Sequence, residues 1–170
     1  TAYATFGHVD VLMNNAGTSQ PSSSWQALGA WRNVIDVNLW GVIHGVQAFT
    51  EAMIEQNSPA LIINTGSKQG ITNPPGNPAY NVSKAGIKAA TESLQHELRN
   101  IKNCRLSAHL LVPGYTFTGL THAGLTQSRV QDKPPAAWLP EQVSDYMVEA
   151  INRGSFYIIC PDNEVSREED

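Results

Sequence analysis

The stretch that most constrains the fold runs from Asn64 to Lys84, because it joins a buried strand to a long helix through a polar loop. The residues before it, 60–63, form a short apolar run rich in β-branched side chains, which is typical of a buried strand. From Ala79 to Asn100 the pattern is helical, and Pro78 suits the first turn of that helix. Loops at the carboxyl ends of strands in open α/β sheets are where ligands bind, so we expect the intervening loop to border a site.

Three side chains of this stretch can converge on one point. Tyr80 and Lys84 lie four residues apart and therefore project from one helix face, and Ser67 stands thirteen residues before Tyr80. A nearby ammonium favours the phenolate and lowers the tyrosine pKa from about 10, and a serine hydroxyl can hold a substrate oxygen. The three residues predict a proton-transfer site. Because no side chain can accept a hydride, any hydride that moves with the proton needs a cofactor.

The rest of the chain alternates strand-like and helical patterns. Apolar runs at 9–13, 106–112 and 156–160 predict strands, and a three- and four-residue apolar period predicts one helix from Trp25 to Glu55 with a serine of the 20–24 loop as its N-cap. Pro140 opens a further helix to about Arg153. The long Gly/Thr/Gln/Pro-rich segment at 115–139 is expected to cover a substrate, with pocket walls formed by four residues: Phe117, Leu120, His122 and Trp138.

Composition excludes several functions. The 170 residues and a hydrophobic content of 41% suit one α/β domain with a real core, residues 1–170. A net charge of −4 without a Lys/Arg cluster argues against a nucleic-acid partner, and no apolar run reaches the roughly 18 residues of a membrane span. The five histidines lack metal-binding spacing, so we expect no metal site. Cys104 and Cys160 form no C-x-x-C pair, which favours a reduced, cytoplasmic setting.

Four motifs together resemble the short-chain dehydrogenase/reductase family. They are Y-x-x-x-K with its upstream serine, N-N-A-G at 14–17, an asparagine at Asn38 within V-N-L-W-G, and P-G-Y-T-F-T at 113–118. Their order and spacing match the family from about Phe6 to Thr118. The resemblance implies a Rossmann-like, doubly wound parallel sheet in a three-layer αβα arrangement, with the N-terminal strands of the family missing.

The resemblance also implies an NAD(P)-dependent oxidoreductase that interconverts a secondary alcohol and a carbonyl on a small-molecule substrate. In that family Tyr80 would be the acid/base, Lys84 would tune it and bind the nicotinamide ribose, Ser67 would position the reacting oxygen, and Asn38 would relay protons where its helix is locally disturbed. The implied cofactor contacts are Asn14, Ala16, Gly17, Tyr80, Lys84, Pro113, Gly114, Thr116 and Thr118. Thr116 stands where the family usually has Val or Ile. The sequence does not distinguish NAD from NADP.

The family's glycine-rich first turn has no counterpart here, so we expect a fragment: the catalytic part of a domain that lacks roughly 70–80 residues of its nucleotide half, since one βαβ unit takes about 30. Small residues on the helix after Pro78 resemble the surface through which family members pair, which implies a homodimer or homotetramer. The alternative from another class is a non-catalytic remnant that acts as a binding or interaction module. An epimerase or dehydratase shares Y-x-x-x-K, but N-N-A-G and the serine spacing favour a reductase.

Overall fold

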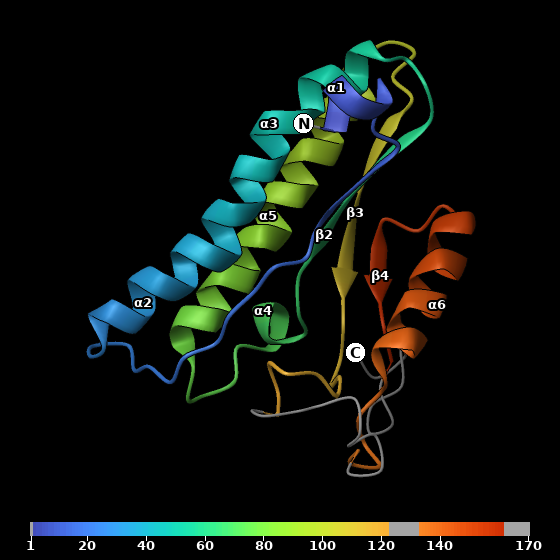
Figure 1. The fold of residues 1–170 in the computed structure, drawn as a ribbon. Coiled ribbons are helices and arrows are strands. Elements are labelled where there is room, and N and C mark those ends of the chain that lie inside the picture. Colours follow the sequence, from blue (N-terminus) through green and yellow to red (C-terminus); the bar gives the residue numbers. More distant parts are fainter. Residues whose placement is uncertain (1, 123–132, 162–170) are drawn as a thin grey trace.

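The computed structural model describes residues 2–122 and 133–161, shown in Figure 1. The middle of the expected substrate cover at 115–139 therefore lies outside the described residues. Within them the chain alternates helices and strands, and none of the described helices is both long and apolar enough to cross a membrane.

Four parallel strands form one sheet in the order β1 (Val11–Asn14), β2 (Ala60–Thr65), β3 (Leu106–Val112) and β4 (Tyr157–Ile159). All four strands expected from the sequence are confirmed, with bounds shifted by at most two residues. Because the strands are parallel, their carboxyl ends meet at one edge of the sheet, and the register aligns Asn14 with Asn64 and Thr65 with Leu111. This edge is the expected place for a site.

Helices lie on both faces of the sheet (Figure 1). On one face α3 (Gly41–Glu55) and α5 (Pro78–Asn100) pack over β1, β2 and β3, with Met53 and Leu98 buried against Ile62. On the other face α6 (Pro140–Asn152) packs against β4, and its Ala150 joins a buried cluster with Ile158. The short α1 (Ala2–Phe6) precedes β1, and α4 (Gln69–Thr72), which the sequence did not predict, follows β2. The expected three-layer α/β architecture is confirmed.

The expectation of one continuous helix from Trp25 to Glu55 is wrong in two ways. The helix begins later, as α2 (Leu28–Ile35), because residues 23 and 26 form a bridge and Ala27 adopts a left-handed φ of 62°; no side chain caps it, so the expected serine N-cap is also wrong. A π-helical turn, η1 (Asp36–Trp40), then separates α2 from α3. The implied local disturbance of the helix at Asn38 is confirmed.

Strand β1 lies at an edge of the sheet and is only partly covered. Its Leu12 packs into the cluster beneath α3 and α5, whereas Val11 and Met13 point to the opposite face. There they remain 52% and 42% exposed, because α6 lies at the far side of the sheet, next to β4.

Candidate active site

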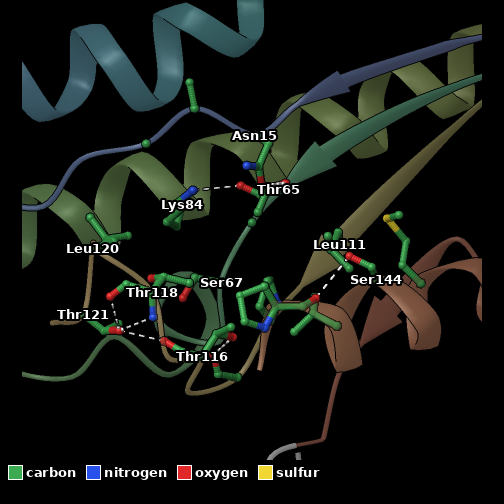
Figure 2. A pocket seen from close by; sticks show the side chains of 18 of the residues that line it. Asn15, Thr65, Ser67, Lys84, Leu111, Thr116, Thr118, Leu120, Thr121 and Ser144 are labelled. Atoms are coloured by element: carbon green, nitrogen blue, oxygen red, sulfur yellow. Dashed lines mark hydrogen bonds between the residues drawn. The ribbon is translucent and has the colours of Figure 1, made fainter. Parts of the chain in front are cut away.

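A cavity of about 570 Å³ opens at the carboxyl ends of β1, β2 and β3. Figure 2 shows its walls: Lys84 reaches in from α5, Thr65 ends β2, and the threonines of the loop after β3 lie opposite Ser144 of α6. Nine of the residues implied by the family resemblance or by the residue chemistry line it: Ala16, Gly17, Ser67, Tyr80, Lys84, Pro113, Gly114, Thr116 and Thr118. Asn14 and Asn38 do not.

Local backbone features bring Ser67 and Tyr80 together. Gly66 follows the last residue of β2, and its N–H donates to Leu111 O at 2.7 Å. A Cβ there would lie 3.3 Å from the same oxygen, so the chain turns tightly against β3. Tyr80 lies in the first turn of α5, where its backbone N–H donates to the capping side chain of Asn77. The Ser67 hydroxyl lies close enough to the Tyr80 phenol to lower the pKa of that phenol.

Lys84 completes the group from one turn further along α5. Its Nζ donates to Thr65 O at 2.8 Å and lies 5.5 Å from the centroid of the Tyr80 ring. Only 4% of the residue is exposed, and this burial lowers the pKa of its ammonium from 10.5 to about 8, because an apolar environment disfavours the charged form. At neutral pH Lys84 is therefore largely charged, but far more easily deprotonated than a surface lysine.

The pKa of Tyr80 moves in the direction opposite to the one expected from its lysine neighbour. Burial raises the pKa above 10.0, and the hydrogen bond from Ser67 opposes this increase without reversing it. Desolvation of the phenolate is the dominant effect here. Tyr80 is therefore a protonated phenol at neutral pH, ready to donate its O–H.

Asn38 is fully buried beside the cavity rather than in its wall. Its Oδ1 accepts from the Thr18 N–H at 2.7 Å, and its Nδ2 donates to Thr18 O and to Ser83 Oγ, both at 3.0 Å. A Cβ built on Gly17 would lie 3.6 Å from Asn38 Oδ1 and 3.8 Å from Lys84 Nζ, so these two groups flank the same glycine. Asn38 thus ties the segment after β1 to α5.

Asn14 faces the interior below the cavity. Its Nδ2 donates to Asn64 Oδ1 at 2.8 Å, and Asn64 in turn donates to Thr91 on α5. Gly45 permits this arrangement, since a Cβ there would lie 2.1 Å from Asn14 Oδ1. The hydrogen bonds of Asn14 favour bracing of the sheet over the implied contact with a cofactor.

The expected substrate walls divide between cavity and core. Leu120 lines the cavity, whereas Phe117 is buried and His122 packs against its ring, and Trp138 packs against Tyr146 of α6. Several lining residues were not expected: Met13, Asn15, Thr65, Gly66, Leu111, Thr121, Pro140, Val143, Ser144 and Met147. Asn15 lies inside N-N-A-G and Thr65 beside Ser67, so motif proximity could have found both. The α6 residues carried no comparable signal.

No group of three His, Cys, Asp or Glu side chains that could hold a metal occurs within residues 2–122 and 133–161. The donors at the cavity are instead hydroxyl, amide and ammonium groups. This donor set suits an organic ligand rich in hydroxyl and carbonyl groups.

The fold and this site define a parallel α/β protein with a Ser–Tyr–Lys group at the carboxyl ends of its strands. A family model described as short chain dehydrogenase matches residues 1–128. The chain belongs to the short-chain dehydrogenase family.

Individual relatives agree with that assignment. The chain is 31% identical over 154 residues to a CLA biosynthesis dehydrogenase/reductase of Lactiplantibacillus plantarum, covering 90% of this chain and 51% of the relative. It is 35% identical over 119 residues to a 3-oxoacyl-acyl-carrier-protein reductase, FabG, of Staphylococcus aureus, covering 69% and 47%. The chain thus spans about half the length of the curated relatives it matches.

Solved structures show the same fold. A short-chain dehydrogenase/reductase from Burkholderia phymatum, crystallised with NAD, superposes with a TM-score of 0.81 at 32% identity, covering 93% of this chain and 63% of the other. A short-chain dehydrogenase from Sphingobium yanoikuyae in complex with NADPH gives a TM-score of 0.73 at 20% identity, covering 88% and 56%, a likeness of fold alone.

Proposed function

We propose that these residues form the catalytic part of an NAD(P)-dependent oxidoreductase that interconverts a secondary alcohol and a carbonyl. The observation that carries the proposal is the meeting of Ser67, Tyr80 and Lys84 at one cavity, with the ammonium 5.5 Å from the centroid of the phenol ring. Family membership supports the reaction class, and the NAD complex of the similar structure from Burkholderia phymatum supports a nicotinamide cofactor.

The cavity residues fit a nicotinamide cofactor. The Lys84 ammonium carries three protons and the bond to Thr65 O uses one, so two remain to donate to ribose hydroxyls. Thr116 and Thr118 add hydroxyl groups on the opposite wall, suited to a carboxamide. Gly17 has no side chain that would occupy the space beside the Lys84 ammonium. When bound, the nicotinamide supplies or accepts the hydride that no side chain can carry.

The side chains would move the proton. In the reducing direction Tyr80, protonated at neutral pH, donates its O–H to the carbonyl oxygen as the carbon gains its hydride, and the C=O becomes C–H and O–H. Ser67 donates to the same oxygen and steadies the developing charge. The Lys84 ammonium then stabilises the phenolate left behind. The oxidising direction reverses each step.

Substitution of the tyrosine tests this proposal. In the full-length polypeptide that carries these residues, Tyr80→Phe should lower kcat by about 100-fold or more, the usual contribution of a general acid. The Kd for NADH or NADPH should change little, since the ring remains. Tyr157→Phe is the matched control, because Tyr157 lies on β4 and bonds to Glu92 at the surface. A Tyr80→Phe enzyme within a few-fold of wild type refutes the acid/base role and favours the non-catalytic alternative.

We also propose self-association through the outer face of α5 and η1. Val82 and Trp40 are 47% and 48% exposed there, and Ala85 and Ala89 add small exposed side chains at helical spacing. Gly86 takes no part, because a Cβ on it would lie 3.0 Å from Leu39 of the same chain. Val82→Glu should convert a dimer to a monomer in light-scattering measurements of mass. An unchanged mass would place the interface elsewhere.

A further inference from the structure

The hydroxyl of Thr121 contacts several backbone atoms of the cavity loop that follows β3. Thr121 Oγ1 lies 2.7 Å from Thr116 O, 3.1 Å from Thr118 O, 3.1 Å from Thr118 N and 3.1 Å from His122 Nδ1 (Figure 2 shows the contacts with Thr116 and Thr118). Thr116, Thr118 and Thr121 all line the cavity. The position of this hydroxyl therefore sets the shape of one cavity wall.

The hydrogen bonds of the Thr121 hydroxyl indicate which ring nitrogen of His122 carries the hydrogen. A threonine hydroxyl has one proton to donate, and the shortest contact directs it to Thr116 O. The oxygen then accepts from the Thr118 N–H and can accept again, but it has no proton left for His122. His122 Nδ1 must carry the hydrogen and donate it to Thr121. In the neutral imidazole Nε2 is then unprotonated and can accept from Tyr115 O–H, which lies 3.2 Å away.

Aromatic packing holds the imidazole in that orientation. The Tyr115 ring stacks on His122 with centroids 6.0 Å apart, and Phe117 meets it edge-on at 4.5 Å. Phe117 is itself 3% exposed and so is anchored in the core. The histidine thus connects a fixed aromatic pair to the cavity loop.

We propose that His122, in its Nδ1–H tautomer, is a positioning residue for cofactor binding. The donors run in one direction, from Tyr115 O–H to His122 and from His122 to Thr121, whose hydroxyl closes the turn on Thr116 O. This relay holds the turn that presents Thr118 to the cavity. The inference rests on the proposed function, because it assigns the nicotinamide end of the cofactor to this wall.

Two variants test separately the hydrogen bond from His122 to Thr121 and the hydrogen bond from Tyr115 to His122. His122→Asn keeps a donor at the place of Nδ1, and His122→Gln keeps an acceptor at the place of Nε2, while both lose the aromatic ring. We expect His122→Gln to raise the Kd for NADH or NADPH about three- to tenfold, as for one lost hydrogen bond, and His122→Asn to stay within about twofold of wild type. The KM for the cofactor should rise in parallel while kcat stays unchanged, since Tyr80 is untouched. His96→Gln, an exposed histidine on α5, is the control.

A second readout is independent of activity. Nitrogen-15 NMR of the histidine side chains should report the Nδ1–H tautomer for His122 in wild type, with the signal assigned by its loss in His122→Gln. The tautomer preference should weaken in Tyr115→Phe, which removes the donor to Nε2. An Nε2–H tautomer overturns the inference, as do equal losses of affinity in the Asn and Gln variants, which would indicate ring packing alone. Unaltered affinity in both variants of a cofactor-binding protein also overturns it. A wild-type protein that binds neither cofactor contradicts the proposed function first, and leaves the tautomer measurement standing as a separate result.

Discussion

The charged side chain of Lys84 is buried, with only 4% of the residue exposed. This burial affects the stability of the fold as well as the chemistry of the site. One hydrogen bond to Thr65 O does not replace full hydration of an ammonium. The folded protein therefore releases the lysine proton near pH 8, whereas the unfolded chain holds it to about pH 10.5.

This difference predicts a specific pH dependence. Between about pH 8 and pH 10 the unfolded chain binds more protons at this position, so the stability of the wild type should rise with pH. Lys84→Met lacks the titrating group. The free energy of unfolding of the variant minus that of the wild type should therefore fall by about 2–3 kcal/mol from pH 7 to pH 10. Urea denaturation at both pH values measures it, and parallel pH profiles for the two proteins would contradict the burial of the charge.

At the scale of elements, the site depends on how closely α4 approaches α5. A Cβ on Gly70 would lie 2.7 Å from the backbone carbon of Lys84 and 2.9 Å from the Ala85 nitrogen. These are backbone atoms within a helix and cannot move aside individually. Because α4 begins just after Ser67, the position of α4 against α5 also determines the distance between Ser67 and Tyr80.

Gly70→Ala should consequently harm both folding and catalysis. The added methyl must push α4 away from α5, which should lower stability by about 1–3 kcal/mol, the usual range for overpacking. Gly41→Ala is the matched control: it is also a helical glycine, but among the described residues no atom beyond its chain neighbours and its own helix backbone lies within 4 Å of its Cβ position, so the change should be neutral or slightly stabilising. Thermal or urea unfolding of the two variants provides the test, and equal stabilities would mean that α4 yields without cost.

At the scale of the whole molecule, the two faces of the sheet are unequally covered. Helices α3 and α5 cover β1 to β3 on one side (Figure 1). On the other side α6 packs on β4 and on residues of β3 and β2, and leaves Val11 and Met13 of β1 exposed. Within the described residues β1 pairs only with β2, so its outer edge offers free backbone groups beside exposed apolar side chains. Such an edge is a template for association with another chain.

A charge on that edge should therefore keep the 170-residue chain apart from its copies. Val11→Lys should lower the concentration-dependent light scattering of the chain, because the charge disfavours pairing at β1. Val148→Lys on α6 is the control, since Val148 is 53% exposed, close to the 52% of Val11, but lies on a helix without a free edge. If both substitutions reduce scattering equally, general surface charge rather than the strand edge is responsible.

Elements with a local sequence pattern could be predicted before the structure was known. The apolar runs of β2 and β3 and the period of α5 stand out because a strand or helix repeats its side-chain pattern over a few residues. The convergence of Tyr80 and Lys84 follows from the same cause, since an i, i+4 spacing on a helix needs no tertiary information. Ser67 could be predicted to join Tyr80 and Lys84, because the end of a strand and the start of the following helix border the same loop.

Features that depend on contacts between distant segments could not be predicted from the sequence. Burial raises the Tyr80 pKa although the lysine spacing predicted the opposite, because desolvation is set by everything packed around the ring. Asn14 turns to Asn64, and Asn38 to Thr18, because partners 50 and 20 residues away complete their hydrogen bonds. The π turn at Asn38, the seat of α4 on α5 and the cavity wall from α6 have the same origin: each is a contact between elements, and no short stretch of sequence records the distance at which two elements pack.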